Sequence, residues 1–175
     1  MRLEQTEDIM EEQRRQQFET LLQSHQAIVA KVANTYCWHP DDRADLVQEI
    51  AAQLWRAWPR YDPSRTFTTW MYRVALNVAI SFVRKAVRHR DRSVPLDETV
   101  HHIVEAPNTD DMQDRLQRLQ VFIERQAPLD RALLLLYLED KSQREIAEIL
   151  GITQTNVSTK ISRLKQKDAR GDLVL

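Results

Sequence analysis

The hydrophobic positions of this chain recur at spacings of three and four, which is the period of amphipathic helices. All six prolines lie between the periodic stretches, as expected for a residue that ends helices. No alternating run is long enough to predict a strand. The pattern therefore predicts an all-α protein, with helices at residues 7–36, 42–58, 68–90, 110–126, 130–138, 143–150 and 153–165.

The last two predicted helices are joined by a very short turn that contains Gly151. Glycine adopts the left-handed conformation that ends a helix without a Cβ penalty, and Thr153 is a natural N-cap for the next helix. Two helices joined in this way form a helix-turn-helix, whose second helix can enter the major groove of DNA. On that helix Val157, Ile161 and Leu164 fall within an arc of roughly 60°, which predicts their burial.

The opposite face of this second helix carries hydrogen-bonding groups and no acid. Short hydroxyl and amide side chains suit base edges, and the basic residues beside them suit phosphates. Residues 141–167 hold six Lys/Arg and two acids, a local net charge of +4. A solvated helix hairpin has the same periodicity, but the glycine spacing and the acid-free face favour DNA binding. The residues predicted to contact bases are Gln154, Thr155, Ser158, Thr159 and Ser162, and those predicted to contact phosphates are Lys160, Arg163 and Lys165.

A second basic surface is predicted on the helix at residues 68–90. Polar residues recur there at spacings of 4, 4, 3 and 4, within about 80° of one another, and Lys85 adds to the basic end. The solvated side of a surface helix is the plain alternative. An arginine-rich ridge without acids that includes an amide favours phosphates and bases instead. The ridge consists of Arg73, Asn77, Ser81, Arg84 and Arg88.

The charge distribution divides the chain into two domains. Residues 93–114 hold six acids and no Lys or Arg, with few hydrophobic residues, as is typical of a linker. We therefore predict an N-terminal domain at residues 1–92, a flexible acidic linker at 93–109, and a C-terminal helix-turn-helix domain at 110–175. The acids near the start of the helix at 42–58 favour its dipole, and they also form a candidate protein-docking face.

Composition excludes several other classes. The net charge is −1 and there is a single cysteine, Cys37, so an internal disulfide is impossible and a reducing compartment is expected. No hydrophobic run approaches the ~20 residues that span a bilayer, and a cytoplasmic protein without membrane contact of its own follows. His25, Cys37 and His39 lack the partners and spacing of a metal site. We find no catalytic motif and expect no metal, no cofactor and no enzymatic activity.

Three stretches in series resemble the RNA polymerase sigma factors of the extracytoplasmic-function (ECF) type, in the sigma-70 family. Residues 45–58 (DLVQEIAAQLWRAW) resemble the helix that binds core polymerase. Residues 67–85 (FTTWMYRVALNVAISFVRK) resemble the helix that reads and melts the −10 element. Residues 129–167 resemble the domain that reads the −35 element. The resemblance implies a factor that directs promoter-specific initiation, with core RNA polymerase, promoter DNA and an anti-sigma factor as partners.

The resemblance also implies roles for individual residues. Asp45, Gln48 and Glu49 correspond to contacts with the clamp helices of the polymerase's largest subunit, and the acidic linker to a segment that enters its nucleic-acid channel. The loop at residues 62–67 corresponds to one that holds a flipped base, for which Phe67 and Asn77 are our candidates. The implied −10 contacts are Phe67, Arg73, Asn77, Arg84, Lys85 and Arg88, and the implied −35 contacts are Gln154, Thr155, Ser158, Thr159, Lys160 and Arg163.

A stand-alone helix-turn-helix regulator is the alternative. One recognition helix reads few base pairs, so such a protein must dimerise. The sequence shows no heptad pattern sustained over several turns, and a regulator of this kind leaves the arginine ridge unexplained.

Overall fold

The computed structural model describes the backbone of residues 2–92 and 111–167, and the side chains of residues 10–88 and 116–167. Within these ranges there is no strand, and the all-α prediction is confirmed. The predicted acidic linker at 93–109 lies outside the described residues. The helices are α1 (Arg2–Ser24), α2 (Gln26–Tyr36), α3 (Pro40–Ala57), the 3-10 helix η1 (Trp58–Arg60), α4 (Phe67–Arg92), α5 (Asp111–Arg125), α6 (Pro128–Leu138), α7 (Gln143–Leu150) and α8 (Gln154–Lys167).

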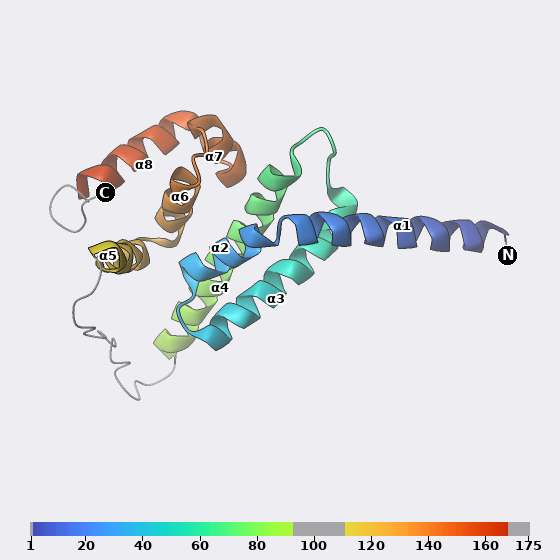
Figure 1. Ribbon diagram of the computed structural model, residues 1–175, viewed down its shortest axis with the longest axis horizontal. Helices are drawn as coiled ribbons and strands as arrows, with labels where there is room; N and C mark the ends of the chain where they lie inside the picture. The colour runs from blue at the N-terminus through green and yellow to red at the C-terminus, as the bar shows by residue number, and fades with distance from the viewer. Residues whose placement is uncertain (1, 93–110, 168–175) are drawn as a thin grey trace.

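The N-terminal bundle, α1–α4, is built around α4. Helices α2 and α3 pack against α4 and against each other, while α1 extends away from the bundle toward the N-terminus (Figure 1). Within the described side chains of α1, Phe18 is buried, and the Trp58 indole N–H donates to the Arg14 carbonyl oxygen at 3.2 Å. The aromatic side chains of α1, α3, η1 and α4 therefore hold this end of the bundle together.

The C-terminal bundle, α5–α8, has an aliphatic core. Leu133 and Leu136 of α6 and Ile146 of α7 are fully buried, and α6 packs against both α7 and α8. Val157, Ile161 and Leu164 of α8 are buried as their spacing predicts. At roughly 1.5–3 kcal/mol for each fully buried aliphatic side chain, this face holds α8 against α6 and α7.

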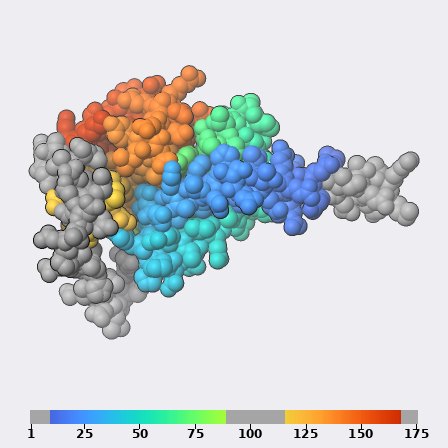
Figure 2. Space-filling view, in the orientation of Figure 1, coloured from blue at the N-terminus to red at the C-terminus, as the bar shows by residue number. Residues whose placement is uncertain are grey.

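The two bundles pack directly against each other. Helix α7 lies against α4, and α6 lies against α2 and α4, so the buried residues of both bundles form one continuous hydrophobic cluster. In the space-filling view the atoms of α6 and α7 adjoin those of α2 and α4 (Figure 2).

The prediction of a single helix at residues 7–36 was wrong. These residues form two helices, the latter part of α1 and all of α2, because the chain turns at His25 (φ −120°, ψ 16°). The His25 ring packs against Phe67 at 5.2 Å, and its Nδ1 lies 2.9 Å from the Leu21 carbonyl oxygen. This break depends on a partner more than forty residues away in sequence, so local periodicity does not predict it.

Candidate nucleic-acid interface

The polar ridge of α4 faces solvent. Arg73, Asn77, Ser81, Arg84 and Arg88 are all exposed, as the sequence predicts. The other side of the helix is buried through Met71, Ala75, Leu76 and Ala79 against α2 and α3. Because the buried side fixes the rotation of α4 about its axis, the whole ridge is held outward, where it can meet a phosphate backbone.

The candidate polymerase surface on α3 lies next to this ridge. Asp45, Gln48 and Glu49 are exposed, while the neighbouring Leu46 and Ile50 are buried. The Glu49 carboxylate lies 4.0 Å from the Lys85 ammonium of α4. Both side chains are largely exposed, so this ion pair contributes at most about 1 kcal/mol and either partner is free to exchange it for another.

The loop before α4 has a defined conformation. The Asp62 carboxylate accepts a hydrogen bond from the Ser64 backbone N–H at 2.9 Å, which lowers the pKa of Asp62. The Tyr61 hydroxyl donates to the Arg65 carbonyl oxygen at 2.8 Å, and the Thr66 and Thr69 hydroxyls are 2.7 Å apart. The loop is therefore shaped by its own hydrogen bonds before any ligand binds.

Phe67 lies at the inner side of this loop. Its side chain is 9% exposed and packs against the rings of His25, Trp58, Tyr61 and Trp70 at centroid distances of 5.2–6.2 Å. In this conformation the faces of the Phe67 ring are covered by protein. The predicted role of Phe67 in holding a base is not tested by its position, but Phe67 clearly supports the loop from within.

Local capping shapes the helix-turn-helix. The Ser142 hydroxyl oxygen accepts from the Glu145 backbone N–H at 3.2 Å, and the Glu145 carboxylate accepts from the Ser142 backbone N–H at 2.9 Å. This is a reciprocal capping box at the start of α7. Gly151 ends α7 in the left-handed conformation, at φ 67° and ψ 33°. The Thr153 hydroxyl accepts from the Asn156 backbone N–H at 3.2 Å, as expected of the predicted N-cap.

The outward face of α8 carries the predicted base-reading residues. Gln154, Thr155, Ser158, Thr159 and Arg163 are all exposed. The Thr159 hydroxyl donates to the Thr155 carbonyl oxygen at 2.9 Å, so Thr159 retains accepting capacity toward DNA. The exposed surface therefore has the donors and acceptors that major-groove edges pair with.

Lys160 is less free than its neighbours on α8. Its ammonium pairs with the Asp130 carboxylate of α6 at 3.1 Å, and the two side chains are 29% and 20% exposed. This ion pair ties α8 to α6. A contact between Lys160 and a phosphate requires the side chain to leave Asp130 or to share its charge.

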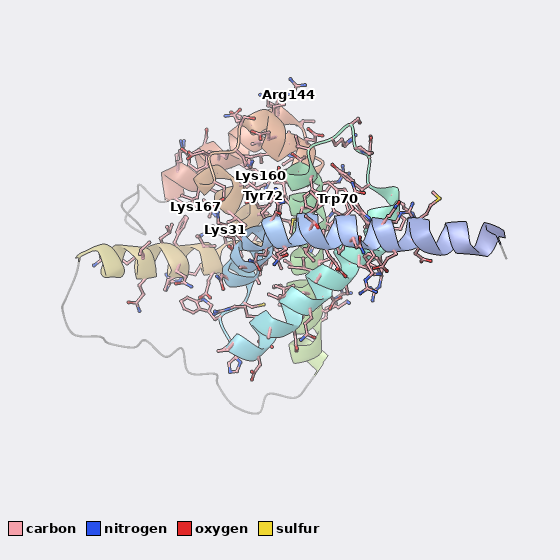
Figure 3. The ribbon with its side chains drawn as sticks, turned by 45° about the vertical axis from the view of Figure 1, so that its right-hand side comes forward. Lys31, Trp70, Tyr72, Arg144, Lys160 and Lys167 are labelled. Carbon is pink, nitrogen blue, oxygen red and sulfur yellow. The ribbon has the colours of Figure 1, made fainter. Side chains whose placement is uncertain are left out.

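Contacts between the bundles were not predicted from sequence. The Glu139 carboxylate pairs with the Lys31 ammonium at 2.5 Å and accepts from the Tyr72 hydroxyl at 3.3 Å. Burial and the nearby Glu139 charge raise the pKa of Tyr72 to about 12. In Figure 3, Lys31, Tyr72 and Lys160 lie on the side of α4 that faces the C-terminal bundle. Lys31, Tyr72 and Glu139 come from distant parts of the chain and share no sequence motif.

Two further contacts join the bundles. Arg65, in the loop before α4, pairs with Glu148 of α7 at 3.3 Å. The Tyr36 hydroxyl donates to the Pro128 carbonyl oxygen at 2.6 Å, and burial raises the pKa of Tyr36. The loop next to the predicted −10 surface is thus tied directly to the helix-turn-helix.

Two family models match the chain. Sigma-70 region 2 matches residues 21–89, and sigma-70 region 4 matches residues 116–167. The chain belongs to the sigma-70 family. Region 2 covers α2, α3 and most of α4, and region 4 covers most of α5 and continues to the end of α8. The order and position of the two regions agree with the resemblance noted in the sequence.

The similar curated proteins are sigma factors, and two of them are of the ECF type. An ECF sigma factor, SigE of Mycolicibacterium smegmatis, is 29% identical over 154 residues, which cover 86% of this chain and 59% of SigE. The sigma factor SigV of Bacillus subtilis is 26% identical, covering 82% of this chain and 84% of SigV. The ECF sigma-E factor of Haemophilus influenzae is also 26% identical, covering 85% of this chain and 84% of that protein.

Two solved structures share the fold. CnrH, in complex with the cytosolic domain of CnrY, has a TM-score of 0.61 at 22% identity, covering 87% of this chain and 85% of CnrH. The sigma factor RpoE of Bartonella quintana, in complex with the anti-sigma factor NepR, has a TM-score of 0.66 at 19% identity, covering 86% and 92%. The sigma-70 chain described here therefore has the helical architecture of other sigma factors.

Residues 10–88 and 116–167 contain no cluster of three or more His, Cys, Asp or Glu side chains placed to hold a metal ion. Cys37 is buried, and its burial raises the pKa of the thiol to about 11. None of the described helices is long and hydrophobic enough to cross a membrane.

Proposed function

We propose that this sigma-70 chain binds core RNA polymerase and directs it to specific promoters, reading the −35 element with α8 and the −10 element with α4. The observation that carries the proposal is the presence of two exposed, acid-free polar surfaces in one chain, one in each of the regions that the sigma-70 models match. Catalysis belongs to the polymerase, whose site of action is the cytoplasm.

On α8, the assignment follows the chemistry of each side chain. Gln154, Thr155, Ser158 and Thr159 are the base-reading residues, because amides and hydroxyls pair with base edges in the major groove. Lys160 and Arg163 contact phosphates, which fix position and carry no sequence information.

On α4, the guanidinium groups of Arg73, Arg84 and Arg88 and the Lys85 ammonium bind the phosphates of the −10 strand. Asn77 sits between Arg73 and Arg84 on the exposed face and provides the amide that can pair with an unstacked base. Unstacking a base costs a few kcal/mol, so strand opening needs a site that holds the base once it has left the duplex.

On α3, the exposed Asp45, Gln48 and Glu49 are the proposed polymerase contacts, and the clamp helices of the largest subunit are the proposed partner. The Glu49–Lys85 ion pair at 4.0 Å supports a shared edge between the proposed polymerase surface and the proposed DNA surface. Binding of the polymerase to Glu49 leaves Lys85 available to DNA.

The packed arrangement of the two bundles must open on a promoter. The −35 and −10 elements are about 25 base pairs apart, roughly 85 Å at ~3.4 Å per base pair. Helix α7 packs on both α4 and α8, so the two DNA surfaces are far too close to span that distance. The Lys31–Glu139 and Arg65–Glu148 ion pairs are partly exposed, and such pairs contribute only about 0–1 kcal/mol each.

We further propose that an anti-sigma factor regulates the chain. The similar RpoE structure contains an anti-sigma factor, NepR. An anti-sigma factor that holds the two bundles together keeps the two DNA surfaces too close for the promoter. When the anti-sigma factor dissociates, the polymerase can hold the two bundles at the separation of the two promoter elements.

Co-purification distinguishes this proposal from the stand-alone regulator. The chain should bind core RNA polymerase in a pull-down and should not bind a palindromic site as a dimer on its own. Dimeric binding to a palindrome without polymerase would support the alternative.

Replacing Asn77 tests the −10 assignment. Asn77→Ala should leave polymerase binding unchanged, because Asn77 lies on α4 and not on the α3 face. It should reduce strand opening on a duplex promoter, measured by the reactivity of unpaired thymines to permanganate. Unchanged opening would remove Asn77 from the proposed role.

A further inference from the structure

Lys160 differs from the other basic residues of α8 that are predicted to contact phosphates. Its side chain is 29% exposed, and its ammonium lies 3.1 Å from the Asp130 carboxylate of α6, whereas Arg163 is exposed. Lys165 also contacts α6, but its ammonium lies over the uncharged Tyr137 ring, 4.6 Å from the ring centre, and its side chain is exposed. The charge of Lys160 is therefore neutralised inside the C-terminal bundle, while the contact of Lys165 leaves its charge in place.

The position of Lys160 on α8 allows it to reach two partners. It lies about 65° from the centre of the buried face of α8 and about 100° from Thr159 on the outward face. Because a lysine ammonium sits on a flexible four-carbon stem, the side chain can turn toward α6 or toward DNA. A phosphate that approached while Asp130 stayed paired would place two anions side by side, which is unfavourable. DNA and Asp130 therefore compete for the same ammonium.

Asp130 is held in place by the residues around it. It lies in the first turn of α6, where the helix dipole favours an acid, and its side chain is 20% exposed. The Pro128 carbonyl oxygen accepts from the Tyr36 hydroxyl at 2.6 Å, and Arg131 Nε donates to the Gln126 carbonyl oxygen at 3.1 Å. Since this turn is already ordered, Asp130 loses little side-chain freedom when it pairs with Lys160. It also keeps a favourable position at the helix N-terminus when Lys160 leaves.

We propose that Asp130 is a positioning residue that competes with DNA phosphates for Lys160 and so limits the affinity of α8 for duplex DNA of any sequence. This inference rests on the proposed function, because it concerns the regulation of the proposed −35 site. When α8 docks on duplex DNA, a phosphate replaces the Asp130 carboxylate beside the Lys160 ammonium, and the broken ion pair subtracts from the binding free energy. Phosphate contacts carry no sequence information, so Asp130 lowers affinity without changing which bases are preferred.

Replacing Asp130 in the full-length chain tests the proposal without polymerase. The probe is fluorescently labelled duplex DNA of random sequence, titrated by fluorescence anisotropy in about 50 mM salt, where contacts with phosphates are strong. Asp130→Asn should tighten binding about 2- to 5-fold, the range that corresponds to a partly exposed ion pair. Asp130→Glu keeps the carboxylate and should bind as weakly as the wild-type chain.

A gain in affinity is a result that a purely structural role of Asp130 does not produce, since loss of structure weakens binding. Unchanged or weaker binding by a folded Asp130→Asn chain would overturn the proposal. Circular dichroism shows whether that variant folds as the wild-type chain does. If its melting temperature falls, Asp130→Ser, which also removes the charge, provides the same test with the same expected gain.

A double-mutant cycle separates competition for Lys160 from general repulsion. An acid near DNA also repels phosphates whether or not it pairs with Lys160. In a Lys160→Met chain, Asp130→Asn should therefore give a smaller gain than in the wild-type chain, and the difference measures the ion pair. Asp140→Asn, the same loss of charge at an exposed residue just after α6, is the matched control and should tighten binding less than Asp130→Asn. Equal gains from Asp130→Asn in both backgrounds would show that Asp130 acts by repulsion alone, and the proposal would be wrong.

Measurements with core RNA polymerase separate failure of this inference from failure of the proposed function. In the holoenzyme, Asp130→Asn should strengthen binding to promoters with different −35 sequences by the same factor and leave their ranking unchanged. A changed ranking would mean that Asp130 affects base reading, contrary to the proposal. If the chain selects no promoter with core polymerase, while Asp130→Asn still tightens binding to random duplex DNA through Lys160, the proposed function fails and the role of Asp130 stands.

Discussion

The two bundles hold the helices that we propose to read DNA by different physical means. In the N-terminal bundle, α4 is held by long packing contacts with α2 and α3 and by a cluster of aromatic rings at its first turn. In the C-terminal bundle, α8 is short and depends on an aliphatic face, a capping box and a single left-handed glycine. The aromatic cluster supports the first turn of the helix that we propose meets the opened −10 strand, whereas the aliphatic face positions the helix that we propose reads duplex DNA.

The stabilities of the two bundles can be compared because all four tryptophans lie at or before residue 70. Tryptophan fluorescence therefore reports on the N-terminal bundle, whereas circular dichroism reports on the helices of both bundles. Leu133 is fully buried in the C-terminal core, so Leu133→Ala should lower the free energy of unfolding by about 2–5 kcal/mol. Circular dichroism should then show helix loss at a lower temperature than the change in tryptophan fluorescence. Leu138→Ala, at a residue that is 42% exposed, serves as the control and should change little. Equal shifts by both probes would mean that the bundles unfold as one unit.

Two substitutions test whether base reading and phosphate binding belong to different residues of α8. Gln154→Ala should change which base is preferred at one position of the −35 element, with a discrimination of about 1–3 kcal/mol. Lys160→Ala should weaken binding to all sequences and reduce the salt dependence by about one charge. Asp130→Asn leaves Lys160 in place without its partner and should not reduce the salt dependence. If Gln154→Ala and Lys160→Ala weaken all promoters equally, the two roles are not separate.

The turn between α7 and α8 depends on backbone conformation rather than on space. A Cβ at Gly151 would meet no atom within 4 Å, but the φ of +67° is unfavourable for a residue with a side chain. Gly151→Ala should therefore destabilise the C-terminal bundle by about 1 kcal/mol, measured by chemical denaturation. Asp140 has a similar positive φ of 53°, so Asp140→Gly should have the opposite effect. A stabilising Gly151→Ala would show that the turn relaxes to another conformation.

The capping box gives the C-terminal bundle a dependence on pH. Hydrogen bonds from the Ser142 side chain and backbone lower the pKa of Glu145. A lowered pKa in the folded state means that the contribution is present above the ordinary glutamate pKa of about 4.3 and is lost as the pH falls through the lowered value. Glu145→Gln should therefore cost roughly 0.5 kcal/mol near pH 7, and this difference should disappear in acid. A difference independent of pH would assign the cap to Ser142 alone.

Local signals explain which parts of the fold were predictable. The bounds of α7 and the Thr153 cap follow from residues within one turn of each helix end, and the sequence predicts them correctly. The break at His25 depends on packing against Phe67, and the contacts of Glu139 with Lys31 and Tyr72 join residues far apart in the chain. No periodicity encodes such contacts.

The candidate DNA surfaces were predictable for a related reason. Arg73, Asn77 and Arg84 share an exposed face because helical spacing determines direction. The burial of the Phe67 ring, by contrast, depends on aromatic partners from several elements and is seen only in the folded structure.

Transcription in vitro tests the central claim most directly. Core RNA polymerase and this chain, incubated with fragmented genomic DNA, should produce transcripts from discrete start sites that core polymerase alone does not use. The sequences upstream of these sites should share two short elements about 25 base pairs apart, one for α8 and one for α4. Transcripts that are the same with and without the chain would contradict its assignment as a promoter-selecting sigma factor.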